Sequence, residues 1–201
     1  QVLCQNGDEE ATETIQNQSV GAVSFPVGYT DINNQQVDQR TTNSWTLRLH
    51  EVSLPEMMEV FAINTIAPTV LNARLKGLME RTKQPGKDQG EEPWLKFIVN
   101  VSAMEGRFYK YKQETHPHTN MAKSALNMQC RTSSQDYVKS HIYMTCVDTG
   151  WINLELPAER AKRHETRHFF QTPLDEIDAA ARILDPMIGP LHDIQNGDKD
   201  V

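Results

Sequence analysis

The stretch LKFIVNVSA, residues 95–103, decides the fold. It is short, rich in β-branched residues and almost continuously apolar, which is typical of a strand buried on both faces. A second stretch of the same kind, HIYMTCVD, occupies residues 141–148. A helical pattern lies between the two, so we expect the strands to pair in parallel in a βαβ unit.

The clearest predicted helix covers residues 53–83. It opens on Ser53-Leu54-Pro55-Glu56, a capping box in which the serine oxygen accepts an amide hydrogen and the glutamate reaches back. Pro55 falls in the first turn, where its missing N–H is not needed. Pro68 lies inside the same apolar pattern and predicts a kink or break near residues 64–68.

Two further helices complete the alternation of elements. One covers residues 119–140, and the other begins at Thr172-Pro173-Leu174-Asp175 and ends at Asp185-Pro186. Helix, strand, helix, strand and helix in this order indicate parallel βαβ units. The predicted fold class is therefore α/β, a partial Rossmann-like, doubly wound and mostly parallel sheet flanked by helices.

The composition changes along the chain and suggests three segments. Residues 1–45 are acidic and amide-rich, and we expect a polar, partly disordered N-terminal segment. Residues 46–188 carry the Rossmann-like part, and residues 189–201 form a polar tail. The chain begins with Gln1, and only 38% of its residues are hydrophobic. Both observations favour a fragment of a longer protein.

Charge and cysteine content exclude several classes of protein. Twenty basic and 27 acidic residues give a net charge of −7, so direct binding of nucleic acid is not expected. No apolar run approaches the ~20 residues that span a bilayer, so no membrane association is expected. The three cysteines, Cys4, Cys130 and Cys146, cannot all pair with one another. They indicate reduced thiols and an intracellular protein of the cytoplasm or an organelle matrix.

Five short motifs between residues 43 and 187 resemble, in order, the C-terminal half of a short-chain dehydrogenase/reductase. The motifs are FAINTIAP, IVNVSAMEG, NMAKSALN, VDTGWIN and TPLDEIDAAARILDP. The resemblance implies a doubly wound sheet, an NAD or NADP cofactor and hydride transfer catalysed by a serine, a tyrosine, a lysine and a helix asparagine. By this resemblance the chain is divergent and lacks the N-terminal cofactor-binding part.

The resemblance also assigns the catalytic positions. Asn64 matches the helix asparagine that holds a water in a proton relay, and Lys123 matches the lysine that binds the nicotinamide ribose. The catalytic tyrosine is expected four residues before that lysine, where this chain has Thr119. The catalytic serine is expected at Ala103, and Ser102 stands immediately before it. Two of the four catalytic groups are therefore replaced.

The cofactor-binding positions transfer only in part. Thr149, Gly150 and Ile152 lie in the turn that positions the nicotinamide in the resembled family, where Thr149 replaces a proline. The glycine-rich turn that holds the pyrophosphate at a helix N-terminus has no counterpart in the 201 residues. We therefore expect the chain to be inactive on its own.

Three side chains are candidates to replace the missing phenol. A threonine hydroxyl is too weak an acid to act as a general acid or base, whereas a phenol beside a cation can do so. His118 is the best substitute, because an imidazole titrates near neutral pH and lies next to the vacant position. Tyr109 and Tyr111 lie in the loop before Thr119 and are weaker candidates.

Two other functions remain open. The chain could be a non-catalytic scaffold or assembly subunit, forming a homo-oligomer or larger assembly through the helices at residues 53–83 and 119–140. The sequence His164-Glu165-Thr166-Arg167-His168 has the spacing of a zinc hydrolase helix. Its neighbours Lys162 and Arg163 add positive charge that repels a dication, so we expect no metal, and a zinc hydrolase is a remote alternative.

Overall fold

The computed structural model describes residues 24–30, 36–82, 94–168 and 172–195. The chain divides into two compact units. The first unit consists of Gln1–Thr46 and Leu154–Gln171, and the second of Leu47–Asn153 and Thr172–Val201. The second unit contains the sheet and most of the helices, and each unit is described separately.

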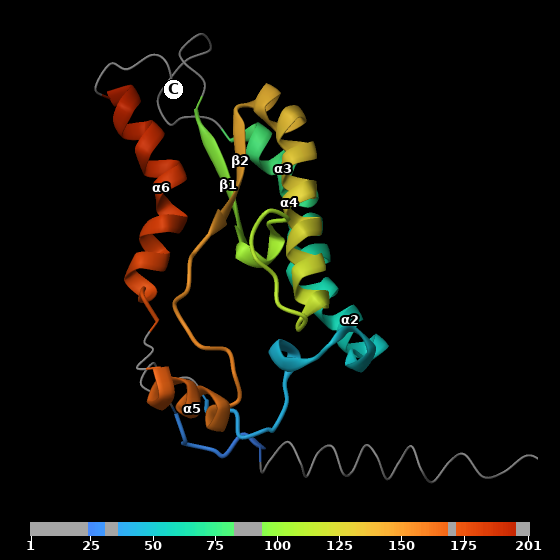
Figure 1. Cartoon of the computed structure of the whole chain (residues 1–201). Coiled ribbons are helices and arrows are strands. Elements are labelled where there is room, and N and C mark those ends of the chain that lie inside the picture. The colour runs from blue at the N-terminus through green and yellow to red at the C-terminus, as the bar shows by residue number, and fades with distance from the viewer. Residues whose placement is uncertain (1–23, 31–35, 83–93, 169–171, 196–201) are drawn as a thin grey trace, which may run out of the picture. The chain divides into compact units, whose positions relative to one another are not determined.

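The two predicted strands are present and pair in parallel in the second unit. Strand β1 (Lys96–Ser102) lies beside β2 (Ile142–Asp148), with Lys96 opposite Ile142 and Ser102 opposite Asp148. This confirms both the position of the strands and their direction. The chain passes from β1 to β2 through a long helix, so the pair forms a βαβ unit (Figure 1).

The first long helix is interrupted where Pro68 predicted a break. Helix α2 (Leu54–Phe61) continues into a π-helical turn, Ala62–Ile66, and then into α3 (Ala67–Arg81). Ser53 caps α2 and accepts a hydrogen bond from the Glu56 amide at 3.3 Å. Pro68 lies in the first turn of α3. The wider π turn accommodates the carbonyls that the proline cannot pair.

The helices of the second unit lie on both faces of the β1–β2 pair. Helix α4 (Pro117–Tyr137), extended by a 3-10 turn at Val138–Ser140, packs with α3 on one face. Helix α6 (Glu176–Gln195) lies on the other face (Figure 1). This three-layer arrangement confirms the predicted α/β class.

The predicted end of the last helix at Asp185-Pro186 is wrong. Helix α6 runs on to Gln195 and contains both Pro186 and Pro190. The two prolines are four residues apart, so their lost hydrogen bonds fall on one side of the helix. Pro186, Met187 and Pro190 are all partly buried, and this packing offsets the lost bonds.

The alternation of side chains along the strands separates the two faces. Ile142 and Met144 are buried against α4, together with Leu126 and Cys130 of that helix, whereas Tyr143 points to the opposite face and is partly exposed. A series of buried hydrogen bonds between polar groups connects α3, β1 and α4. The Asn72 side chain of α3 donates to Asn100 Oδ1 of β1 at 2.9 Å, and the Tyr137 hydroxyl donates to the Asn72 carbonyl at 2.9 Å.

The first unit is held by polar contacts. Arg40 pairs with Asp38 at 2.9 Å and lies over the ring of Phe25, and the Asn43 side chain donates to the Glu155 carbonyl at 2.9 Å. Helix α5 (Ala158–His168) starts where the Ala158 amide donates to the Asp38 carbonyl. Among the residues that the structure describes, none of the helices has the length and hydropathy needed to cross a bilayer.

Candidate functional site

The residues assigned by resemblance gather where β1 and β2 end. Ser102 is the last residue of β1, and Asp148, opposite it, is the last residue of β2. Helix α4 begins on the same side, so its first turns, with Thr119 and Lys123, lie near these strand ends (Figure 1). The carboxyl ends of parallel strands are the usual place for ligands in such sheets. We treat this edge as the candidate site.

Lys123 is fixed by a contact inside the chain. Its Nζ donates to the backbone carbonyl of Val101 at 3.0 Å, which joins α4 to the end of β1. Partial burial lowers the pKa of Lys123 below its ordinary value, and the nearby Glu105 and Cys146 act in the opposite direction. The ammonium group is thus partly desolvated at the edge of the sheet.

Ser102 is buried beneath the site rather than exposed in it. Its side chain is 5% exposed, and its hydroxyl has no hydrogen-bond partner among the described residues. Ala103, at the position of the family's serine, follows with extended backbone and starts the 3-10 turn Met104–Gly106. Residue 103 is an alanine and has no hydroxyl, and the Ser102 hydroxyl is buried.

Asn64 lies in the π turn, close to the helix that carries Lys123. Its side-chain amide donates to the Val60 carbonyl at 3.0 Å, within the same helix. The adjacent Thr65 hydroxyl donates to the Ala122 carbonyl of α4 at 2.8 Å. The π turn that contains Asn64 is therefore in contact with α4 through Thr65, and π turns are frequent at functional sites.

Thr119 and His118 lie in the first turn of α4 in different environments. Thr119 is half-buried, one turn before Lys123. His118 has no exposed surface, and its Nε2 lies 3.5 Å from Glu56 Oε1 of α2. Burial lowers the pKa of His118, against the opposing effect of the Glu56 carboxylate. A fully buried imidazole offers no surface to a substrate, so His118 lies between two helices and outside the open part of the site.

The loop with Tyr109 and Tyr111 holds both rings in solvent. They are 77% and 82% exposed, and the loop is anchored on either side of them. The Gly106 carbonyl accepts from the Asn127 side chain at 3.0 Å, and Lys112 donates to the carbonyls of Met104 and Glu105. A side chain at Gly106 would collide with the α4 backbone, which explains the glycine. In this structure neither phenol takes the place of the missing tyrosine.

The turn after β2 places Gly150 in the left-handed region of backbone conformation, which glycine adopts without strain. Gly150 has φ +79°, and its amide donates to Asp148 Oδ1 at 3.0 Å. An added Cβ would lie 2.4 Å from Leu174 Cδ1, so the turn is packed closely against the start of the last helical segment. Thr149 and Ile152 flank this glycine and are half-buried.

Sequence reasoning missed an ion pair that ties the loop to this turn. Arg107 Nη2 lies 3.6 Å from Asp148 Oδ2, whose carboxylate also accepts from Gly150. The only signal was an acidic residue at the end of a predicted strand, which is too common to indicate a partner. The prediction of no metal stays untested. Helix α5 is present at residues 164–168, but the side chains of His164, Glu165 and His168 lie outside the described part of the structure.

Comparison with solved structures identifies the architecture. The chain is similar to the carbonyl reductase Sniffer of D. melanogaster, with a TM-score of 0.51 and 15% identity over 89% of this chain and 66% of that one. It is also similar to a 4-hydroxyisoleucine dehydrogenase complexed with NADH and succinate, with a TM-score of 0.51 and 16% identity over 94% and 73% of the two chains. At these identities the likeness shows a shared fold, a parallel sheet flanked by helices, and does not show a shared activity.

Sequence comparison adds one curated relative and no activity. No family model matches the chain. It is 28% identical over 172 residues to an uncharacterized protein, R665, of Acanthamoeba polyphaga mimivirus, a match that covers 82% of this chain. The chain spans about a third, 34%, of the length of that relative.

The residues present fit a nicotinamide dinucleotide only at one end. The resemblance assigns Lys123 and the Gly150 turn to the nicotinamide riboside, but in the structure the Lys123 ammonium donates its hydrogen bond to the Val101 carbonyl. The sequence contains no glycine-rich turn to hold a pyrophosphate at a helix N-terminus. The proton-transfer end is also incomplete, because residues 103 and 119 are alanine and threonine. The described site does not fit the whole cofactor.

Proposed function

We propose that this chain uses the dehydrogenase fold as an assembly module and does not itself catalyse hydride transfer. The observation that carries the proposal is the apolar outer face of the α2–α3 helix pair. A soluble protein rarely exposes a contiguous apolar face of this kind unless another surface covers it.

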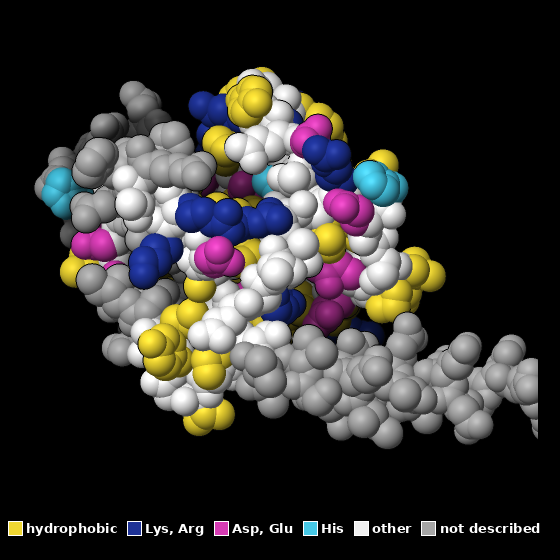
Figure 2. Space-filling model, turned by 60° about the horizontal axis from the view of Figure 1, so that its bottom comes forward, with side chains coloured by type: hydrophobic (Ala, Val, Ile, Leu, Met, Phe, Trp, Pro, Cys, Tyr) yellow, Lys and Arg dark blue, Asp and Glu magenta, His cyan; other side chains and the backbone are white. Residues whose placement is uncertain are grey.

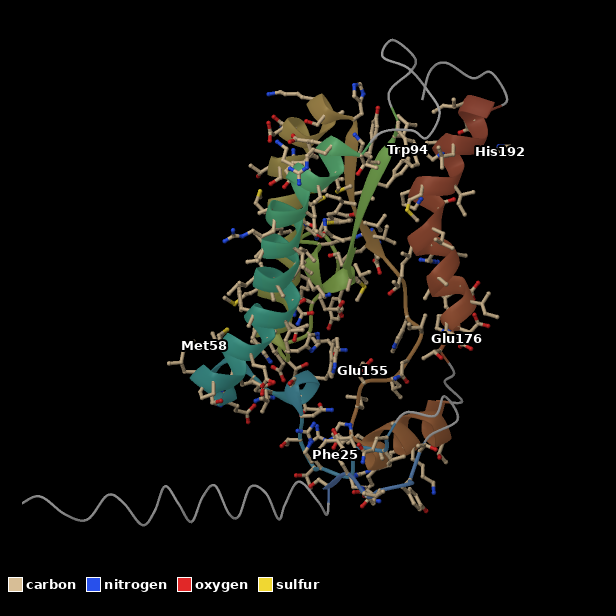
Figure 3. The ribbon with its side chains drawn as sticks, turned by 180° about the vertical axis from the view of Figure 1, so that it is seen from behind. Phe25, Met58, Trp94, Glu155, Glu176 and His192 are labelled. Carbon is tan, nitrogen blue, oxygen red and sulfur yellow. The ribbon has the colours of Figure 1, made fainter. Side chains whose placement is uncertain are left out.

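Eight large hydrophobic side chains along the helix pair are exposed, and we refer to them together as the apolar face. Met58 projects outward from α2 in Figure 3, and Figure 2 shows other hydrophobic side chains at the molecular surface. Their exposed fractions lie between 44% for Leu75 and 71% for Leu54. The face consists of Leu54, Met58, Ile63, Ile66, Val70, Leu71, Leu75 and Leu78.

A second copy of this chain is the occupant that the charges favour. Glu59 is exposed near the start of the helix pair, and Arg74 and Arg81 are exposed in its second half. Two copies packed antiparallel about a two-fold axis near Ala67 would place each Glu59 beside Arg74 of the other copy. An isologous contact of this kind repeats the favourable pair twice.

The state of the catalytic positions supports the same proposal. A threonine hydroxyl at residue 119 cannot take the role of a phenol, and the Ser102 hydroxyl is buried. Without amides at a helix N-terminus, the pyrophosphate would lose most of its binding free energy. The fold thus keeps its packing while two of the four catalytic residues that the resemblance assigns are replaced.

The oligomeric state and cofactor binding of the purified chain test the proposal together. We expect sedimentation equilibrium to show a dimer, and Leu71→Glu or Val70→Glu to shift it to monomer, because each buries a charge in the contact. Lys139→Glu, an exposed change outside both helices, is the matched control and leaves the dimer intact. Calorimetric titration with NADH and NADPH should show no saturable binding up to millimolar concentration. A monomeric wild-type chain, or micromolar cofactor binding, would overturn the proposal.

An oxidoreductase is the second candidate, and the placement of Lys123 favours it. Its partly desolvated ammonium lies at the carboxyl edge of the sheet, with Asn64 on the neighbouring π turn. These are the two catalytic residues that the resemblance retains. Oxidation of NADH by the purified chain in the presence of aldehydes and ketones, lost in Lys123→Met, would support this candidate.

A further inference from the structure

Two of the three cysteines meet in the core, although they are far apart in the sequence. Cys130 lies on the sheet-facing side of α4, and Cys146 lies on β2, on the strand face turned toward that helix. Both contribute to one hydrophobic cluster with Ile142, Met144 and Tyr137. Both are free thiols in the structure.

The hydrogen bonds around the sulfurs bring Cys146 to the turn of α4 that carries Cys130. Cys146 Sγ donates to the Leu126 carbonyl at 3.9 Å, and Leu126 is one helical turn before Cys130 on the same side of α4. The two thiols are close enough to change each other's pKa, and the Asn100 side chain, opposite Cys146 in the sheet, also affects the pKa of Cys130. The two cysteines therefore lie on the facing sides of one helix–strand contact, α4 on one side and β2 on the other.

The surroundings make one sulfur the better nucleophile. The neighbouring Cys146 thiol lowers the pKa of the Cys130 thiol, and the side chain of Asn100 acts in the same direction. The neighbouring Cys130 thiol and burial raise the pKa of Cys146, which therefore remains protonated. Cys146 is the more accessible of the two, because it is half-buried whereas Cys130 is 6% exposed.

We propose that Cys130 and Cys146 are a disulfide-forming pair that a peroxide oxidises to link α4 covalently to β2. The Cys130 thiolate attacks one peroxide oxygen, the O–O bond breaks, and the products are a Cys130 sulfenic acid and hydroxide. The Cys146 sulfur then displaces the sulfenic oxygen, which leaves as water, and the S–S bond forms. Two thiols and one hydrogen peroxide yield one disulfide and two waters, with both electrons going to the peroxide.

The link would join the part of α4 that lies two turns beyond Lys123 to the strand that leads into the Gly150 turn. Lys123 and Cys130 are seven residues apart on one side of the helix, so fixing Cys130 also restricts the sliding of α4 over β2. Oxidation would thus rigidify the candidate site from beneath, without a change at its surface.

Peptide mapping after peroxide treatment of the whole folded chain tests the pair directly. Trypsin separates the three cysteines, because Cys130 falls in peptide 124–131, Cys146 in 140–160 and Cys4 in 1–40. We expect the mass of each chain to fall by that of two hydrogens. Digestion should yield a disulfide-linked peptide of residues 124–131 and 140–160, which dithiothreitol reduces to its two parts. Hydrogen exchange should slow along α4 and β2 in the oxidised chain.

Matched variants make the outcome decisive. Cys4→Ser should leave the linkage intact, whereas Cys130→Ser and Cys146→Ser should each abolish it. Diamide, a second small oxidant, should give the same linked peptide. The proposal fails if the circular dichroism is native and both oxidants leave Cys130 and Cys146 reduced. It also fails if either cysteine links to Cys4 or to a second chain instead.

Discussion

The Lys123 ammonium donates a hydrogen bond to the backbone carbonyl of Val101, 3.0 Å away, and so joins α4 to the end of strand β1. The resemblance to dehydrogenases assigns this lysine to the ribose of a cofactor. In the structure the same side chain already has an internal partner. The contact gives Lys123 a structural role that does not depend on a bound dinucleotide.

The first prediction separates these two roles. Lys123→Met keeps the aliphatic part of the side chain and removes its charge. The variant loses the hydrogen bond to Val101, but folding no longer has to desolvate an ammonium group, so the two effects on stability largely cancel. We expect the free energy of unfolding in urea to change by less than about 1 kcal/mol. Lys123→Ala, which also loses the stem, should cost about 1–2 kcal/mol. A wild-type chain that binds NADH and a Lys123→Met chain that does not would instead establish the ribose role.

A second prediction concerns acid sensitivity. Burial depresses the pKa of His118 in the folded chain, so the unfolded chain takes up this proton first as the pH falls. The stabilisation is complete above the unfolded value, about 6.5, and is lost as the pH falls from there toward the folded value. Urea midpoints measured between about pH 7.5 and pH 5.5 should therefore decrease.

The control for that experiment is another histidine. His118→Gln should flatten the decrease, because the buried titrating group is gone. His141→Asn should retain it, since His141 is exposed and its backbone is left-handed, a conformation that asparagine tolerates. An equal pH dependence in wild type and His118→Gln would show that other groups cause the acid sensitivity.

The elements that could be predicted are those defined by local pattern. The strands at residues 95–103 and 141–148 are shortened by no more than one residue at each end, and Ser53 and Pro68 mark the start of α2 and the π turn. Capping, β-branched runs and proline act over a few neighbouring residues, so the sequence alone carries them.

The features that escaped prediction depend on distant residues. Nothing near Pro186 signals that α6 continues, because the packing that offsets its lost hydrogen bond comes from the sheet. The burial of His118 requires Glu56 and α2, and the meeting of Cys130 with Cys146 requires the helix–strand contact. Composition predicted reduced cysteines, but only the fold brings Cys130 and Cys146 together.

A third prediction tests the core between α4 and the sheet. Leu126 is 2% exposed, so Leu126→Ala removes buried methyl groups and leaves a cavity, at a cost of about 2–5 kcal/mol in the free energy of unfolding. Met128 lies on the same helix and is 58% exposed. Met128→Ala should therefore change stability by less than about 0.5 kcal/mol. Similar costs in urea melts of the two variants would contradict the burial described for α4.

A fourth prediction concerns the turn after β2. Gly150→Ala places a methyl group against Leu174 on a backbone with φ +79°, so strain and overlap add. We expect a loss of about 2 kcal/mol or more in the free energy of unfolding. Gly77→Ala, in the interior of α3 with an added Cβ in ordinary contact, should instead be neutral or stabilising, because alanine favours the helix. Thermal melts of both variants measure the difference.

The last prediction restores the missing catalytic groups and asks whether activity returns. Ala103→Ser with Thr119→Tyr completes the set that the resemblance assigns, with the phenol one turn from the Lys123 ammonium. That cation should lower the phenol pKa, which an absorbance titration of the double variant against Ala103→Ser alone would show. NADH oxidation with aldehydes and ketones should nevertheless stay at the rate without protein, because the chain still has no glycine-rich turn for the pyrophosphate. Turnover by the double variant, absent from both single variants, would show that the rest of the fold binds the cofactor and would overturn the assembly-only proposal.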